Sequence, residues 1–493
     1  MKKIYDYRMN YKLFIVVFCI FTYSLSAQKD IDSVGLIEDL KIFKNILQQG
    51  HPSLYEYISK DSLDYLFDNI EASSRDGLTD IELYKNMLKI TDAIKDGHLL
   101  LFAPNTIKTD QYYFPLILKI INTEFYTDTD DFGIPIGSKI NSINGERMPR
   151  VLEKLKKYSP TDGYNLTRKY RDIELKFGLF FAYEYGIVKQ YTIEYIEPDG
   201  LEKTISLPAE SFVKVKLRNT KRSSYFSKYH YQKNNPNFFD KYISNREPFV
   251  YYKEELNAAV LVINSFAGDI RIFKSNLTKI FKEINKKKIA HLIIDVRNND
   301  GGFRSNAVNL YSFITKKAFK QTVNEFVISL SVLERKYKTQ TFLSEKEFLK
   351  DKFKNHAVFD GWRLPFDDQE PLMVPDQNRY NGSVYILAGG TTFSAGATFV
   401  LNAKNDPDIT IIGEDTGGGY YFHTGEFPVY YEFPNSKTQM VMSMVKVTHY
   451  VKEKSIPKGS GIPPDKHIVL SQKDLIEGKD PQLDYVLRLI SRK

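Results

Sequence analysis

Residues 385–397 read YILAGGTTFSAGA, and the chain is organised around the turn that they contain. The stretch begins as a short apolar run, Val384 to Leu387, which predicts a buried strand. The run breaks at a Gly-Gly-Thr-Thr segment and resumes at Ala395 as small apolar residues that suit a helix. Ser394 therefore stands at a strand-to-helix turn, where its hydroxyl is exposed and the next backbone N–H has no helical acceptor.

A serine in this position has two interpretations. The commonest reason for Ser at a helix start is that it caps the helix. The alternative is a nucleophile, because nucleophilic serines need an accessible hydroxyl and a backbone N–H beside it. The stretch by itself favours the cap, so other parts of the chain have to decide.

Strands and helices alternate from Ala258 onward. Apolar runs predict strands at 259–263, 291–296, 384–387 and 409–412, and helical patterns occur at 270–284, at 306–313 and from residue 395. This alternation predicts an α/β domain with a largely parallel sheet, over residues 257–493.

The preceding half of the mature chain divides into three parts. Residues 28–105 carry apolar positions at helical spacing and predict a helical region that ends at an Asp-Gly-His segment. Residues 106–213 change to strand patterns, and residues 137–145, GSKINSING, end in an Asn-Gly turn typical of a hairpin. Residues 214–256 are polar and rich in Asn, Lys and Tyr, which predicts a linker or arm.

The N-terminus has the layout of a secretory signal peptide. Basic residues precede an apolar run over 13–23, and small residues lead to Ala27, so residues 1–27 are the expected signal peptide. A retained signal anchor is the alternative, although the run is short for a membrane span. Cys19 is the only cysteine, so the mature chain is expected to have neither disulfides nor Cys-ligated metals. We expect a periplasmic or secreted bacterial protein without a stable membrane span.

Composition narrows the range of functions. The 493 residues predict two or three domains. The 69 basic and 61 acidic residues are interspersed, and no basic stripe forms a nucleic-acid module, so we expect no nucleic-acid partner. His-Glu-x-x-His and Gly-Lys-Ser/Thr motifs are missing, so no metal and no cofactor are expected. Among the remaining histidines, His423 follows a glycine cluster and is a candidate for lining a cleft.

Two other predicted strands also run into glycine turns. Residues 297–303 read RNNDGGF and residues 413–419 read GEDTGGG. Glycine lets the backbone approach a ligand closely, although Asn-Asp-Gly is also simply a good turn. In the functional interpretation, the N–H of Gly301 or Gly302 forms one half of an oxyanion hole and that of Ala395 forms the other.

Four motifs follow one another in a characteristic order. They are DVRNNDGG at 295–302, TFSAGA at 392–397, GEDTGGG at 413–419 and GIPPD at 461–465. Together they resemble the carboxyl-terminal processing, or tail-specific, serine proteases. The resemblance implies that Ser394 is the nucleophile and that the α/β domain is a crotonase-like spiral of strands and helices. Residues 137–145 resemble the second half of a PDZ domain, which fits the same family, with a generic hairpin as the alternative.

The general base separates two branches of that family. The processing-protease branch pairs its serine with a lysine near the end of the third motif, where this chain has Gly419. No lysine lies between Lys404 and Lys437. The tricorn-core branch uses a histidine in a helical region before its PDZ domain, and His98 occupies that place. The resemblance therefore implies that His98 is the base, and a neutral imidazole suits that role near physiological pH.

Several alternatives stay open at this point. A lone histidine is more often structural than catalytic, and Lys458 is a second candidate base. Asp96 and Glu453 are candidates for the group that orients His98. The chain is predicted to be a serine endopeptidase that acts on peptides or proteins. The alternatives are a non-catalytic peptide-binding protein that retains the fold, and an esterase of similar mechanism.

Overall fold

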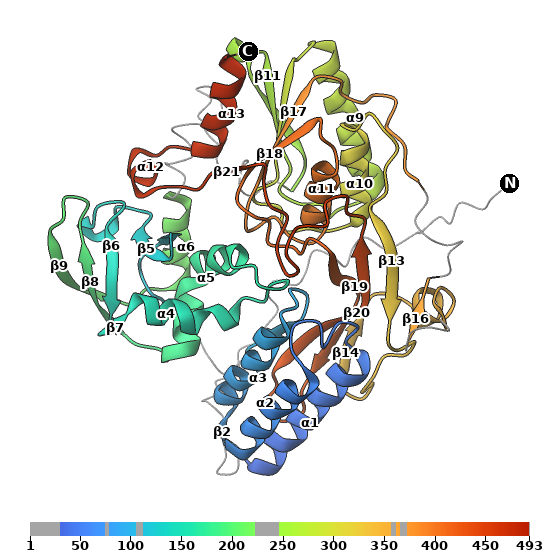
Figure 1. Ribbon diagram of the computed structural model, residues 1–493. Coiled ribbons are helices and arrows are strands. Elements are labelled where there is room, and N and C mark those ends of the chain that lie inside the picture. The colour runs from blue at the N-terminus through green and yellow to red at the C-terminus, as the bar shows by residue number, and fades with distance from the viewer. Residues whose placement is uncertain are drawn as a thin grey trace.

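The computed structural model describes residues 30–73, 78–104, 112–221, 246–355, 361–364 and 372–492. The predicted signal peptide, and residues 222–245 of the predicted linker, lie outside them. Figure 1 shows a helical region, a middle region with its own sheet, and a large α/β region. In the part of the chain that is described, no helix has the length and apolar character needed to cross a membrane.

The helical region consists of three helices, as the apolar spacing predicts. They are α1 (Ser33–Gly50), α2 (Lys60–Ser73) and α3 (Asp80–Ile94). Short strands β1 (Asp30–Ile31) and β2 (Leu78–Thr79) pair with each other. Thr79 and Glu82 form a capping box that fixes the start of α3. Lys95 then adopts a left-handed conformation, with φ of 60°, which ends α3 and turns the chain toward β3 (Leu100–Phe102).

The middle region is an antiparallel sheet covered by helices. Its strands run in the order β4 (Leu118–Ile121), β5 (Glu124–Thr127), β6 (Lys139–Ile143), β8 (Gln190–Ile196) and β9 (Glu202–Pro208). The Asn-Gly turn joins β6 to β7 (Glu146–Arg147), as predicted. Helices α4 (Met148–Leu155) and α5 (Thr167–Tyr185) follow, and α6 (Phe212–Lys221) ends the region.

The α/β region contains the predicted parallel sheet. Its order is β10 (Phe249–Lys253), β11 (Ala258–Val262), β12 (His291–Asp295), β17 (Ser383–Ala388), β18 (Ile409–Gly413) and β21 (Lys466–His467), parallel from β11 onward. Strand β10 falls within the predicted linker and forms the antiparallel edge of this sheet.

Alternate residues of the parallel strands enter two different cores. One face packs against α9 (Ile270–Lys286), α10 (Arg304–Ser312) and α11 (Ala395–Lys404). The other packs against α13 (Pro481–Ser491), which follows the short α12 (Gln472–Glu477). Burial on both faces explains why these strands are continuous apolar runs in the sequence.

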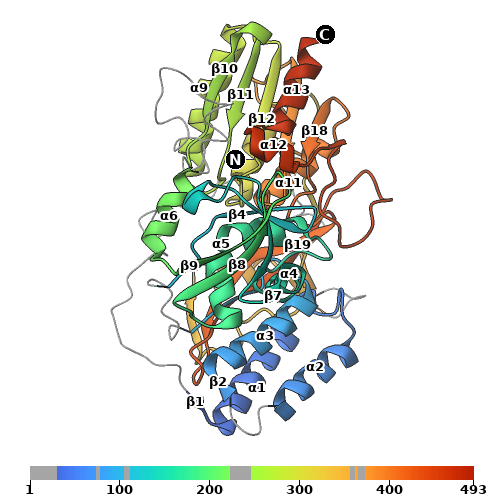
Figure 2. The same cartoon turned by 90° about the vertical axis from the view of Figure 1, so that its left-hand side faces the viewer.

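A second sheet of the same region was not anticipated from the sequence. It has the order β14 (Lys338–Thr341), β19 (Phe422–Glu432), β20 (Gln439–His449), β13 (Thr322–Val327), β16 (Trp362–Arg363) and β15 (Lys354–Asn355). Strand β3 of the helical region pairs with β20, with Leu100 opposite Val441. This pairing attaches the segment after α3 to the α/β region, and the 90° view of Figure 2 shows the helices below and the parallel sheet above.

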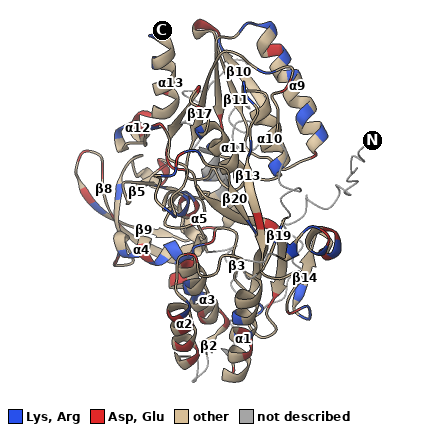
Figure 3. Ribbon diagram, turned by 45° about the vertical axis from the view of Figure 1, so that its right-hand side comes forward, with Lys and Arg blue, Asp and Glu red and all other residues tan. Residues whose placement is uncertain are grey.

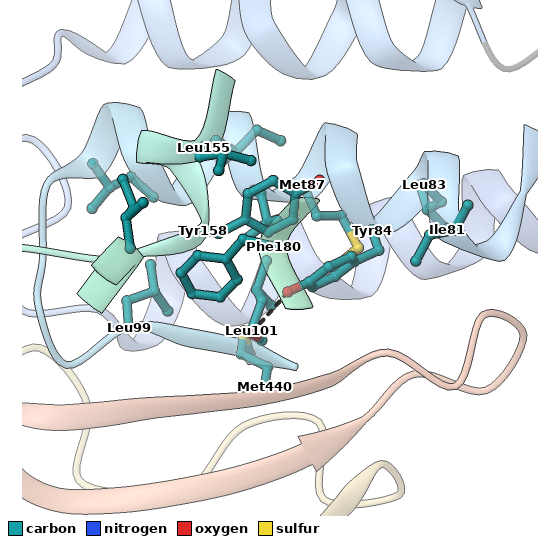
Figure 4. Packing of buried hydrophobic residues seen from close by; sticks show 14 of the residues in the cluster. Ile81, Leu83, Tyr84, Met87, Leu99, Leu101, Leu155, Tyr158, Phe180 and Met440 are labelled. Carbon is teal, nitrogen blue, oxygen red and sulfur yellow. Dashed lines mark hydrogen bonds between the residues drawn. The ribbon is translucent and has the colours of Figure 1, made fainter. Parts of the chain in front are cut away.

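One hydrophobic core joins all three regions. Figure 4 shows Tyr84 of α3, Tyr158 and Phe180 of the middle region and Met440 of β20 packed together. The Tyr84 hydroxyl donates to the carbonyl oxygen of Leu101 at 3.4 Å. Because this core is shared, residues from the three regions are held at fixed positions relative to one another. Basic and acidic residues are interspersed along the ribbon, as Figure 3 shows.

Candidate active site

Ser394 lies in the turn between β17 and α11. Its φ of 50° and ψ of −123° form a conformation that residues with a side chain rarely adopt. Although Ser394 is the N-cap residue by position, its side chain makes no capping hydrogen bond to α11. Its Oγ lies 3.2 Å from Nε2 of His98, which is 296 residues away in the chain. The hydroxyl therefore faces an imidazole rather than the helix that follows it.

Neighbouring loops hold this turn in its strained conformation. The Thr392 hydroxyl donates to the carbonyl oxygen of Val296 at 2.8 Å, and the Phe393 N–H donates to that of Asn299 at 3.0 Å. Gly301 approaches so closely that an added Cβ would stand 2.7 Å from Cβ of Ser394. The glycine turn after β12 thus fits against the serine because it lacks a side chain.

His98 is placed by the end of α3 and by the pairing of β3 with β20. Its ring stacks on Phe393, with 4.7 Å between the ring centroids. Desolvation lowers the pKa of His98 to about 4; the carboxylate of Asp96 opposes this lowering and the cation of Arg168 adds to it. The imidazole is therefore neutral near physiological pH, the state in which it accepts a proton.

Asp96 holds the backbone of the histidine segment. Its Oδ1 accepts the N–H of His98 at 2.7 Å, and its Oδ2 lies 3.0 Å from Nε2 of His51 and accepts the hydroxyl of Thr424. Burial works to raise the pKa of Asp96, but the hydrogen bond and charge of His51 outweigh it and hold the pKa at about 2. Nothing in the sequence indicates that His51 and Thr424 contact Asp96.

The expected oxyanion residues lie around the serine. Within the described residues, the N–H groups of Ala395 and Gly302 have no acceptor. The N–H of Gly301 instead donates to Oδ1 of Asn299 at 2.9 Å. Asn299 is fully buried, and its amide also donates to the carbonyl oxygen of Ile263 at 3.0 Å. Of the two glycines, Gly302 therefore has the N–H that is available to a ligand.

A pair of buried histidines lies beside His98. Nδ1 of His449 is 3.0 Å from the carbonyl oxygen of Tyr420, so this nitrogen carries the proton and Nε2 is an acceptor. Nδ1 of His423 lies 2.7 Å from that Nε2 and therefore donates to it. The His423 ring is 5.7 Å from the His98 ring. Burial lowers the pKa of both His423 and His449, so this pair is neutral at the edge of the site.

Other candidates from the sequence have different partners. The ammonium group of Lys458 is 2.6 Å from Oε1 of Glu56. The carboxylate of Glu453 accepts the N–H of Ser455 at 2.8 Å. Neither has a contact with His98 or Ser394 in the described part of the chain.

A cavity of about 990 Å³ is lined in part by Gly301 and Gly302. It lies between the α/β region and the middle region, where β4 and α5 line it. On the edge strand β4, Ile120 donates its N–H to Glu174 at 2.7 Å and accepts from Arg171 at 3.1 Å. An extended peptide that paired with this edge would have to displace these two side chains.

Three titratable groups near the serine are close enough together to be considered as metal ligands. One ligand atom each of Asp96, His98 and Asp162 lies within 4.8 Å of the other two. However, Nε2 of His98 faces Ser394, and both oxygens of each carboxylate accept hydrogen bonds. In the described residues, these atoms are therefore engaged in hydrogen bonds.

Comparisons with known proteins give one family match and one similar fold. Residues 257–468 match the sequence model of peptidase family S41. No curated protein matches the chain in sequence. A structure of mature CPAF complexed with lactacystin is 14% identical, with a TM-score of 0.60 over 93% of this chain and 98% of that one.

Two further solved structures illustrate the range of similarity. A serine-to-alanine mutant of CPAF is 14% identical, with a TM-score of 0.62 over 93% of this chain and 97% of that one. The photosystem II D1 C-terminal processing protease is 11% identical, with a TM-score of 0.41 over 92% and 97%. At these identities, the similarity to CPAF shows a shared fold.

Proposed function

Residues 257–468 match peptidase family S41, and from this match we propose that the chain is a serine endopeptidase that forms an acyl-enzyme on Ser394. This match confirms the resemblance of the four sequence motifs, and the mixed α/β fold agrees with it. The observation that carries the proposal is the 3.2 Å distance between Oγ of Ser394 and Nε2 of His98. This distance is short enough for a hydrogen bond between a nucleophile and its general base.

In the proposed mechanism, His98 is the general base. Its Nε2 accepts the proton of Ser394 as Oγ attacks the peptide carbonyl carbon, so the ring proton of the resting state is on Nδ1. The imidazolium then donates this proton to the leaving amine. Water, deprotonated by the same Nε2, releases the acyl group and restores the serine.

The N–H groups of Gly302 and Ala395 are the proposed oxyanion donors. Charge develops on the carbonyl oxygen when Oγ attacks, and fixed N–H donors stabilise it without reorganisation. Ala395 directly follows the nucleophile at the start of α11, where the helix dipole also favours negative charge.

The remaining features concern substrate and location. We propose that peptides reach the serine through the cavity between the middle region and the α/β region, and that the middle region is PDZ-like. The predicted signal peptide supports a periplasmic or secreted location. N-terminal sequencing of the mature protein from its host tests this, and an unprocessed Met1 would contradict it.

A fluorophosphonate probe tests the proposed nucleophile. We expect covalent labelling of the folded wild type and its loss in Ser394→Ala. Ser206→Ala is the matched control, because Ser206 is an exposed serine on β9. A folded wild type that resists labelling would favour the non-catalytic peptide-binding alternative.

Peptide turnover separates the two enzymatic possibilities. Internally quenched peptides and simple activated esters should be compared on the same preparation. Cleavage of internal peptide bonds supports an endopeptidase, whereas ester turnover without peptide cleavage would favour the esterase.

A further inference from the structure

Asp162 is a buried carboxylate that the middle region contributes to the site. It lies between the 3₁₀ turn at Lys156–Tyr158 and α5, and is 6% exposed. Its Oδ1 accepts the N–H of Gly97 at 2.8 Å, and its Oδ2 accepts that of Gly419 at 2.9 Å. Asp162 therefore bridges the residue before His98 and the glycine cluster that follows β18.

The ring of His98 has one nitrogen without a partner. With Nε2 directed at Ser394, the ring proton is on Nδ1, which is buried and has no hydrogen-bond partner in the described residues. A ring nitrogen of His98 and an oxygen of Asp162 lie within 4.8 Å of each other. A buried donor without an acceptor is costly, so a nearby carboxylate with unused lone pairs is its natural partner.

Asp96 is less suited to this role. Its Oδ1 accepts the backbone N–H of His98, and its Oδ2 is shared between His51 and Thr424. Among the described residues, each oxygen of Asp162 accepts a single backbone N–H. Catalytic hydrogen bonds are often long before substrate binds, and a small shift of the loop or of the His98 ring would close the remaining gap.

We propose that Asp162 is the positioning residue for His98: it accepts the Nδ1–H hydrogen bond and stabilises the imidazolium that forms when Ser394 is deprotonated. The inference rests on the proposed serine mechanism and adds to it the orienting group. It makes the site dependent on the middle region, because the carboxylate is in place only when that region is packed against α3 and the glycine cluster.

The charges around Asp162 make its ionisation relevant near neutral pH. Burial and the neighbouring Asp96 carboxylate raise the pKa of Asp162 to about 7, against the backbone donors and the Arg168 guanidinium. The charge of Asp162 also acts on Tyr57, and the ring of His423 lies 5.7 Å from that of His98. We expect the reaction rate to rise through about pH 7 as Asp162 ionises.

The test compares Asp162→Asn with Asp199→Asn. Asp199 lies in the exposed turn between β8 and β9 of the same region, and an amide there retains the acceptor for the Leu201 N–H. For both variants and the wild type, the fluorophosphonate labelling rate, kcat and KM are measured from pH 5 to 9, together with thermal unfolding.

We expect Asp162→Asn to lower the labelling rate and kcat at pH 8 by about 10²-fold, to change KM little, and to lose the rise near pH 7. Asp199→Asn should match the wild type. A folded Asp162→Asn with the wild-type pH profile would overturn the proposal, as would a loss of thermal stability without a change in the profile.

A second measurement tests the proposal even if the wild type is inactive or Asp162→Asn does not fold. In ¹⁵N-histidine NMR spectra of Ser394→Ala, assigned with His98→Gln, the His98 ring should stay neutral while its Nδ1 signal shifts as Asp162 titrates. A His98 Nδ1 signal without a step near pH 7 would overturn the proposal. Labelling of wild-type Ser394 tests the serine mechanism separately. A failure of the serine mechanism can therefore be distinguished from a failure of the Asp162 proposal.

Discussion

Gly301→Ala tests the fit between the glycine turn and the nucleophile. Gly301 has φ of 111°, and an added Cβ would stand 2.7 Å from Cβ of Ser394 and 3.1 Å from the carbonyl oxygen of Phe393. Carbon atoms in contact prefer a separation of about 3.5–4.0 Å, so Ser394 has to move by about 1 Å. The substitution therefore has two effects: it strains the backbone at residue 301, and it displaces Ser394, the proposed nucleophile.

Both effects have expected magnitudes. A side chain at positive φ costs about 1–2 kcal/mol, and overpacking costs about 1–3 kcal/mol more, so the free energy of unfolding should fall by about 2–5 kcal/mol. A displacement of about 1 Å in a catalytic group lowers the rate by about 10²-fold.

Gly268→Ala is the matched control for Gly301→Ala. Gly268 has a similar φ of 119°, and nothing lies within 4 Å of an added Cβ. It should lose only the backbone strain of about 1–2 kcal/mol and keep its labelling rate. The assays are urea unfolding and the second-order rate of fluorophosphonate labelling. If Gly301→Ala loses no more stability than Gly268→Ala and is labelled at the wild-type rate, the contact with Ser394 does not constrain the nucleophile.

Three other predictions follow from the same site. His98→Ala should lower kcat by about 10²–10⁴-fold while the protein stays folded by circular dichroism, and unchanged turnover would remove His98 from the mechanism. Lys458→Ala should leave the labelling rate unchanged, because Glu56 binds that ammonium group; a loss comparable to that of His98→Ala would make Lys458 the base. Burial lowers the pKa of His449 to about 4 and holds that of His423 well below its usual range, so the unfolded chain binds more protons below pH 6.5. The free energy of unfolding in urea should therefore fall as the pH drops from 6.5 to 4, by roughly 3 kcal/mol for His449 alone; constant stability across this range would contradict the buried neutral pair.

Local elements could be predicted from the sequence because their causes are local. Continuous apolar runs gave the parallel strands, since both faces of that sheet are buried, and helical spacing gave α1, α3 and α9. The second sheet was missed: β13 pairs with β20 from a distant segment, and β19 and β20, which are consecutive in the chain, were not recognised as a hairpin.

In the candidate site, too, the features with local causes could be predicted and those set by tertiary contacts could not. Ser394 and the glycine turns are visible as motifs, because a strand, a turn and a helix start are each encoded within a few residues. The choice between Gly301 and Gly302 is not visible, since it depends on where the buried Asn299 amide points. The placement of Asp162 depends on the packing of the middle region against α3, so no local sequence pattern predicts it.

By itself, the sequence indicated Ser394 in a strand-to-helix turn as a candidate nucleophile, the upstream His98 as a candidate base and the parallel sheet that carries the serine. Tertiary structure alone decided that Nε2 of His98 lies 3.2 Å from Oγ of Ser394 across 296 residues of chain. The physical reason is that β3 pairs with β20 and that one core is shared by all three regions. These contacts join residues far apart in sequence, and their geometry exists only once the chain has packed.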